Sequence, residues 1–201
     1  MRLFLRFALI LLLLFTASPS AYAASTDLKG VPSGVYALDP DHSSIVFRIS
    51  HFGTSYYTGR FDKFSATLDF DSEHPENSKL DVIIEPSSID TNNPKLEEEL
   101  KGETFFNVIK FRRMTFIATK IVRTGPTTGN VEGDFTLLGV TRPVTMNVTF
   151  NGTVEHFIKK VPVIGFGATG SLKRSAFGLS NLLPMVGDDV TFEIQAEFDK
   201  I

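Results

Sequence analysis

The chain has 201 residues, of which 42% are hydrophobic and 21% are charged. This length allows one domain with a sizeable core, and the composition excludes a long disordered protein. The formal net charge of -3 excludes the basic footprint that nucleic-acid binding requires. Because the chain has no cysteine, disulfides, thiolate metal sites and cysteine nucleophiles are excluded as well.

Residues 1–23 have the order of a secretory signal peptide. Arg2 and Arg6 make the start basic, residues 7–17 are an apolar run broken only by Thr16, and Ala21-Tyr22-Ala23 is a small-x-small site. An N-terminal membrane anchor is the alternative, but the run is shorter than the ~20 residues of a membrane-spanning helix. We therefore expect cleavage after Ala23 and an exported protein without stable membrane insertion.

The mature chain is expected to form one domain. Residues 24–33 are polar and are interpreted as a short leader, and the domain itself is expected over residues 34–201. No shift of composition within that range marks a second domain boundary.

Beyond Gly34 the hydrophobic residues recur with a period of two, which is typical of β-strands with one buried face. Val144, Met146, Val148 and Phe150, for example, alternate with Thr and Asn. The pattern predicts about eight strands, with turn signals such as Asp39-Pro40-Asp41 between them. The expected strands cover residues 42–51, 60–71, 80–84, 113–122, 131–137, 144–150, 164–172 and 190–198.

One helix interrupts the strands. Residues 93–102 begin with Asn93 as a capping residue and Pro94 in the first turn, carry early acids and end at Gly102. These are start and stop signals of a short helix.

Even strand spacing and one-sided apolar faces favour a closed antiparallel barrel or a β-sandwich. An eight-stranded barrel is either filled by its own side chains or holds one small ligand. The 19 Phe and no Trp suit a wall that meets no water. Small inward residues such as Gly133 and Ala168 leave space between these rings, but composition alone leaves a filled core and a cavity equally open.

Strand parity predicts three basic or titratable side chains on the apolar face at strand ends. Counting by two from neighbouring apolar residues places His51, Arg60 and Arg174 there. Each has an alternative as a solvent-exposed residue or, for the arginines, as the partner of a buried acid. A β-bulge within a strand would reverse the parity.

Several ordered segments between about Gly34 and Ile201 form a recognisable series. They are Ser43-Ser44-Ile45-Val46-Phe47, Ser50-His51-Phe52-Gly53, Gly59-Arg60-Phe61, Phe105-Phe106-Asn107, residues 132–144, Gly165-Phe166-Gly167-Ala168, residues 174–178 and Gly187-Asp188-Asp189-Val190. Together they resemble the YceI-like, polyisoprenoid-binding family. The resemblance implies an all-β fold, a single antiparallel eight-stranded lipocalin-like barrel with a short helical insert, secreted to the bacterial periplasm. It also implies a polyisoprenoid, an isoprenoid quinone or a similar long-chain amphiphile held in the apolar interior, and a homodimer.

Two sets of residues are therefore candidates for ligand binding. His51, Arg60 and Arg174 are head-group candidates, since a guanidinium suits a phosphate and a quinone carbonyl needs only one donor. The expected apolar wall consists of Phe47, Ile49, Phe64, Leu68, Phe105, Phe106, Phe116, Phe135, Met146, Phe166, Phe177 and Phe192.

No cofactor or metal is expected. Residues 165–170 spell GxGxxG, but no helix follows them, so a dinucleotide site is rejected. The histidines are dispersed and lack the spacing of metal ligands. The interpretation is a non-enzymatic lipid carrier. The alternatives are an enzyme acting on such a lipid, with His51 as general base, and a cell-envelope interaction protein with a filled core.

Overall fold

The computed structural model describes residues 24–201, so the predicted signal peptide lies outside the described residues. The described chain consists mainly of β-strands with one α-helix. No described helix has the length and hydrophobicity to cross a membrane. The elements are β1 (Gly34–His51), β2 (Ser55–Phe61), β3 (Phe64–Phe70), β4 (Lys79–Ile84), β5 (Ile89–Asp90), α1 (Pro94–Lys101), β6 (Met114–Arg123), β7 (Thr128–Leu137), β8 (Val140–Glu155), β9 (Pro162–Lys173) and β10 (Val186–Lys200), with 3-10 turns η1 (Leu28–Gly30), η2 (Pro75–Asn77), η3 (Pro86–Ser88) and η4 (Arg174–Phe177).

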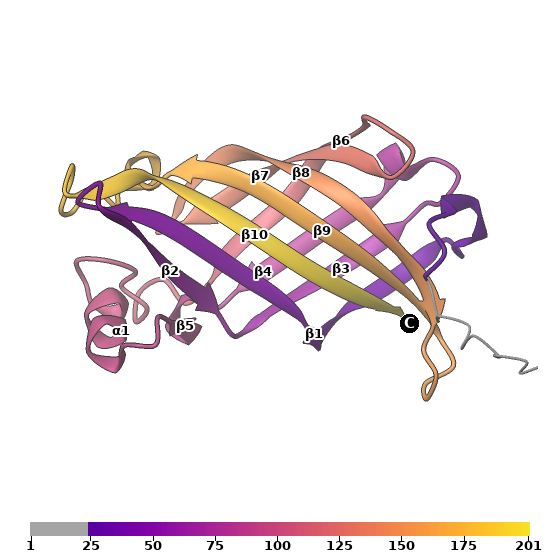
Figure 1. Cartoon of the computed structure of the whole chain (residues 1–201), viewed down its shortest axis with the longest axis horizontal. Coiled ribbons are helices and arrows are strands. Elements are labelled where there is room, and N and C mark those ends of the chain that lie inside the picture. The colour runs from indigo at the N-terminus through magenta and orange to yellow at the C-terminus, as the bar shows by residue number, and fades with distance from the viewer. Residues whose placement is uncertain (1–23) are drawn as a thin grey trace, which may run out of the picture.

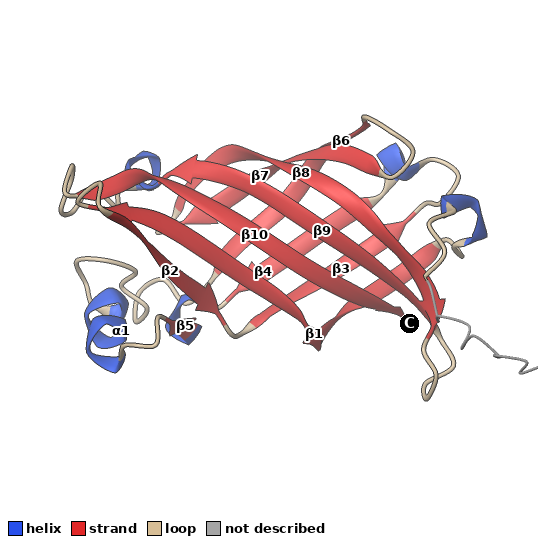
Figure 2. Ribbon diagram, viewed as in Figure 1, coloured by secondary structure: helices blue, strands red, loops and turns tan. Residues whose placement is uncertain are grey.

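The sheet closes on itself because its first and last long strands pair. β10 runs antiparallel to β1 from Tyr36↔Lys200 to His51↔Val186. β3 pairs with the start of the other edge of β1, and β2 pairs with its end. Eight strands therefore form a closed antiparallel barrel (Figures 1 and 2), namely β1, β3, β4, β6, β7, β8, β9 and β10. The expected barrel with a short helical insert is confirmed.

The turn signal at Asp39-Pro40-Asp41 does not separate two strands. It lies inside β1, where the register with β10 shifts between Asp39 and Ser44. The Asp39 carboxylate accepts the Asp41 N–H at 2.9 Å, and the Ser43 hydroxyl donates to the Asp39 carbonyl at 2.7 Å. These hydrogen bonds satisfy polar groups within the irregular segment, so the pairing of β1 with β10 resumes at Ser44.

The expected strand over residues 60–71 is two strands. β2 ends at Phe61 and β3 begins at Phe64, and the residues between them bond to η3. The Asp62 N–H donates to the Ser88 carbonyl at 3.1 Å, and the Lys63 N–H donates to Ser88 Oγ at 2.9 Å. Since Phe61 and Phe64 both line the interior, this break reverses the parity of β2 relative to β3.

The predicted helix is confirmed as α1. Asn93 caps it, its side chain accepting the Leu96 N–H at 3.3 Å, and Gly102 follows its last residue. α1 lies at one end of the barrel, beside β2 and β5 (Figure 2).

Residues 24–33, expected as a polar leader, pack against the opposite end of the barrel. Ser25 pairs with Thr153 of β8, and the side chain of Val31 is only 2% exposed.

Candidate functional site

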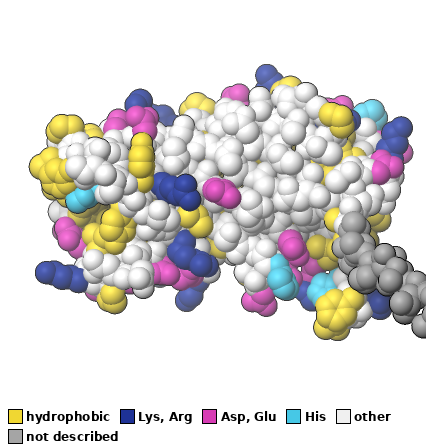
Figure 3. Space-filling model, in the orientation of Figure 1, with side chains coloured by type: hydrophobic (Ala, Val, Ile, Leu, Met, Phe, Trp, Pro, Cys, Tyr) yellow, Lys and Arg dark blue, Asp and Glu magenta, His cyan; other side chains and the backbone are white. Residues whose placement is uncertain are grey.

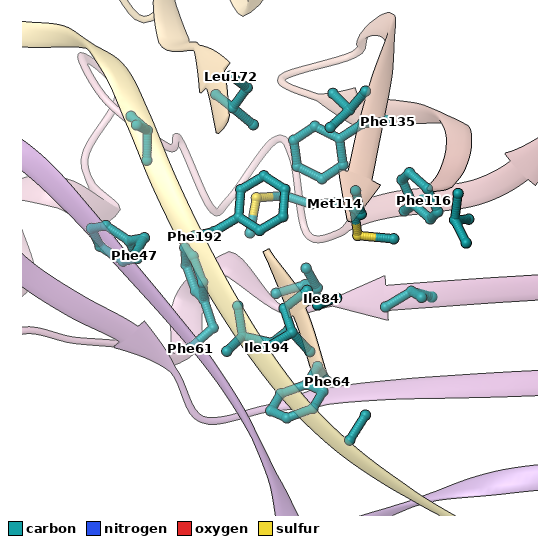
Figure 4. Close-up of a pocket in the computed structure, with 18 of the residues that line it drawn as sticks. Phe47, Phe61, Phe64, Ile84, Met114, Phe116, Phe135, Leu172, Phe192 and Ile194 are labelled. Atoms are coloured by element: carbon teal, nitrogen blue, oxygen red, sulfur yellow. The ribbon is translucent and has the colours of Figure 1, made fainter. Parts of the chain in front are cut away.

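The barrel encloses a cavity of about 540 Å³. That is within the range of roughly 300–1,000 Å³ for small-molecule sites. The cavity reaches both ends of the barrel, because Leu28 and Thr128 line it at one end and His51 and Leu182 at the other. Figure 4 shows rings and aliphatic side chains, Phe47, Phe192 and Ile194 among them, facing this space from several strands. A filled core, one alternative left open by the sequence, is therefore not what the structure contains.

The wall of the cavity is apolar between its two ends. The polar side chains that line it belong to strand ends, turns and the insert, and the remaining lining residues are aliphatic, aromatic, Pro or Gly. The polar set comprises Ser78, Arg123, Thr127 and Thr128 at one end and His51, Tyr57, Thr91, Glu99, Arg174 and Asn181 at the other. This arrangement suits a ligand with a long apolar body, which makes no hydrogen bonds along the wall.

Phenylalanine rings lie over glycines of the wall. A Cβ built on Gly59 would lie 2.4 Å from Phe47 Cζ, and one on Gly170 would lie 2.4 Å from Phe192 Cζ. Phe116 covers Gly133 in the same way, again at 2.4 Å. Because each ring occupies the place of the missing side chain, it lies along the wall and leaves the centre of the barrel open.

We expect Gly170→Ala to reduce ligand affinity about tenfold, which corresponds to ~1.4 kcal/mol. The added methyl group would displace the Phe192 ring from the wall into the cavity. Gly165→Ala is the control on the same strand, since a Cβ there has its nearest neighbours at 3.8 Å. Titration with geranylgeraniol measures the effect, and equal affinities of the two variants would contradict this account of the open space.

All but two of the candidate binding residues line the cavity. The thirteen that do so are Phe47, Ile49, His51, Phe64, Leu68, Phe105, Phe106, Phe116, Phe135, Met146, Phe166, Arg174 and Phe192. Sequence reasoning missed the lining residues Leu96 and Leu100 of α1, although their i, i+4 spacing marks one apolar helix face.

Arg60 is a correction, because it points away from the cavity. Its backbone pairs with Val46, while the neighbouring Gly59 and Phe61 face the interior. The guanidinium forms an exposed ion pair with Asp62, Nε to Oδ1 at 2.7 Å. Parity counted back from Phe64 failed because the Asp62-Lys63 break lies between the two strands.

Phe177 is also a correction, because it is buried but does not line the cavity. β9 ends at Lys173 and η4 begins at Arg174, so the period of two no longer applies. The Phe177 ring packs edge to face against Phe135, with centroids 5.4 Å apart.

Arg174 lies at the cavity wall and holds the following loop. Its Nη1 donates to the Leu179 carbonyl at 2.6 Å, Nη2 to the Val186 carbonyl at 2.8 Å, and Nε to the Gly187 carbonyl at 2.7 Å. Only 6% of the side chain is exposed, and burial lowers its pKa. Three of the five guanidinium N–H groups are thus used within the protein.

Asp188 stabilises the turn that begins with Arg174. Its carboxylate accepts the Ser175 N–H at 2.9 Å and the Ser175 hydroxyl at 2.8 Å. The backbone hydrogen bond from Ser175 is the main cause that lowers the pKa of Asp188. The residues from Arg174 to Asp188 therefore form one hydrogen-bonded unit at this end of the barrel.

His51 is exposed at the same end, with its ring 4.7 Å from that of Phe52. Among residues 24–201 its imidazole makes no hydrogen bond or ion pair, so it lacks the orienting acid typical of a general base. Within the same residues, no group of three His, Cys, Asp or Glu side chains is placed to hold a metal ion.

Sequence comparisons relate the chain to bacterial proteins along most of its length. A UPF0312 protein of Pseudomonas syringae pv. tomato is 33% identical over 163 residues, covering 79% of this chain and 84% of the relative. A UPF0312 protein of Yersinia pestis is 33% identical over 187 residues, covering 92% and 91%.

Solved structures share the fold. The Campylobacter jejuni YCEI protein is 30% identical with a TM-score of 0.69, covering 76% of this chain and 90% of that one. Burkholderia cenocepacia BcnA (22% identity, TM-score 0.72, covering 80% and 98%) shows the fold alone. The same holds for a polyisoprenoid binding domain from Saccharophagus degradans (14%, TM-score 0.61, covering 83% and 98%).

The family model described as "YceI-like domain" matches residues 36–198, which span the barrel from β1 to β10. The match covers most of the chain and agrees with both the relatives and the solved structures. The chain therefore belongs to the YceI-like family.

Proposed function

We propose that this protein binds a polyisoprenoid or isoprenoid quinone inside its barrel and carries it through the periplasm. The observation that carries the proposal is the cavity, whose wall is apolar along its length and polar only at its ends. The fold shared with the polyisoprenoid binding domain from Saccharophagus degradans supports this ligand class. The secretory pattern of residues 1–23 supports the periplasmic location, and the implied homodimer stays a prediction.

Burial of apolar surface supplies the binding energy. Each CH₂ removed from water contributes ~0.8 kcal/mol, so two five-carbon prenyl units contribute up to roughly 8 kcal/mol before entropy is subtracted. Ordering the flexible tail opposes part of this gain. A wall shaped in advance by rings lying over glycines reduces the remaining loss, because the protein orders little further on binding.

Native mass spectrometry of the protein purified from its own periplasm tests the proposal. We expect an added mass that detergent-free extraction identifies as a prenyl lipid, recovered chemically intact. A chemically altered lipid would support the enzyme alternative instead. An empty protein that also fails to take up geranylgeraniol or a prenyl quinone in vitro would reject lipid carriage.

A further inference from the structure

Exposed apolar side chains surround one end of the cavity. Phe52, Leu182 and Met185 are 59%, 50% and 46% exposed, and we call these three residues the mouth patch. They adjoin one another, since the Phe52 N–H donates to the Met185 carbonyl at 2.7 Å and the Val186 N–H donates to the Leu182 carbonyl at 2.8 Å. Figure 3 shows hydrophobic side chains gathered at this end, at the left of the view.

Two residues of the mouth patch, Phe52 and Leu182, have a positive φ, which bulky side chains disfavour. Phe52 and Gly53 have φ of 53° and 67°, and the Thr54 N–H donates to the His51 carbonyl at 3.1 Å. A β-turn with positive φ at both central residues favours Asn-Gly, and a bulky residue there is strained. Leu182 also has a positive φ, of 62°.

A second turn at this end of the barrel also has a bulky residue with positive φ, and there the packing of the side chain compensates for the strain. Leu138 precedes Gly139 with a φ of 53° in the turn between β7 and β8. Its side chain packs against the core, so burial compensates for the strained backbone. Phe52 lacks comparable burial, because the residue is 59% exposed although its ring lies 4.7 Å from that of His51. A surface that covers the ring would supply it.

The mouth patch is continuous with the cavity. Leu182 is both exposed and part of the cavity lining, and His51, another lining residue, directly precedes Phe52. A lipid leaving or entering the cavity at this end would pass the mouth patch.

We propose that the mouth patch docks on the surface of a phospholipid bilayer, so that a prenyl lipid moves between membrane and cavity without crossing water. This inference rests on the proposed lipid-binding function. Binding to a membrane surface strengthens with the apolar area that is buried in the interfacial region of the bilayer. None of the three residues of the mouth patch, Phe52, Leu182 and Met185, is charged, so apolar insertion, rather than attraction to anionic lipid, drives the docking.

A bilayer fits the mouth patch better than a protein partner does. A stable protein interface buries about 800 Å² on each side, with roughly 20–30 residues. The mouth patch has three side chains on two turns, which suits shallow insertion into a fluid surface. Docking is therefore expected to change little with salt, unlike binding by basic clusters.

The opposite end provides a matched control surface. Phe157 and Ile158, at the tip between β8 and β9, are 73% and 71% exposed, yet neither lines the cavity. Lys159 in the same tip bonds to Asp199 of β10 and to Asp39 of β1. This tip offers comparably exposed apolar side chains that are not continuous with the cavity.

A single introduced tryptophan reports which end meets the membrane, because the chain has none. With phosphatidylcholine vesicles, we expect the emission of Phe52→Trp to shift to the blue and to be quenched by brominated lipid. Phe157→Trp should show neither effect. No change in Phe52→Trp, or the same change in both variants, would overturn docking by the mouth patch.

A second pair of variants separates docking from lipid binding. Phe52→Asn/Met185→Ser keeps a favoured turn, and neither residue lines the cavity. We expect it to reduce vesicle co-sedimentation and the rate of geranylgeraniol uptake from vesicles at least tenfold. Its affinity for geranylgeraniol delivered in cyclodextrin should be unchanged. Phe157→Asn/Ile158→Ser should match the wild type throughout.

The outcomes distinguish the two proposals. Uptake from vesicles at the wild-type rate would overturn docking while leaving lipid binding intact. Vesicle binding by a wild-type protein that takes up no prenyl lipid from cyclodextrin would refute the binding function and leave a membrane contact. Crosslinks to another protein at the mouth patch, without vesicle binding, would overturn docking on a bilayer and indicate that a protein partner covers the patch.

Discussion

Ala168→Trp is expected to weaken binding of geranylgeraniol about a thousandfold. Ala168 lies in the middle of β9, lines the cavity and pairs with Ile194 of β10 and Val148 of β8. An indole at this position occupies space that would hold roughly one five-carbon unit of the ligand. Losing that burial removes ~4 kcal/mol at ~0.8 kcal/mol per CH₂, and each ~1.4 kcal/mol is a factor of ten in affinity.

The neighbouring residue gives the control for this prediction. Thr169 is exposed on the outer face of the same strand, so Thr169→Trp should leave affinity unchanged. Equilibrium titration measures both variants, and circular dichroism confirms that each remains folded. Full affinity in Ala168→Trp would place the ligand outside the barrel and contradict the proposed site.

Local alternation predicted the barrel strands well wherever a strand is uninterrupted. β7 to β10 follow the expected alternation because one face meets the apolar cavity and the other meets solvent along each strand. The method failed at Arg60, where two residues between β2 and β3 reverse the parity, and at Phe177, where a 3-10 turn replaces the strand. Neither the break between the two strands nor the 3-10 turn produces a repeating pattern of apolar residues, so counting by two along the sequence does not reveal them.

The local pattern of the sequence also does not predict that the sheet closes or that the cavity stays open. Closure depends on pairing β1 with β10, elements more than a hundred residues apart in the chain. The cavity depends on ring orientation, since the same Phe192 could point into the centre or lie over Gly170. Both features are set by tertiary packing, and composition is compatible with either outcome.

Arg174→Met is expected to lower the free energy of unfolding by about 4.5 kcal/mol. The substitution removes three charge-assisted hydrogen bonds and leaves the carbonyls of Leu179, Val186 and Gly187 without these donors. A bond to a charged group contributes ~1.5–3 kcal/mol, and the lower end is used because two of the three bonds are only partly buried. Urea denaturation measures the change. Unaltered stability would contradict a structural role for the guanidinium.

The adjacent Lys173 provides a comparison for the loss of stability expected in Arg174→Met. Its ion pair with Asp189 joins two side chains that are 61% and 69% exposed, so Lys173→Met should leave the midpoint of urea denaturation nearly unchanged.

The same Arg174→Met variant also tests the head-group role of Arg174. If the two remaining N–H groups bind a phosphate, the variant should lose affinity for a prenyl phosphate more than for the matching alcohol. An equal loss for both ligands would restrict Arg174 to holding the loop beside the mouth patch, and Arg60→Met, outside the cavity, should affect neither ligand.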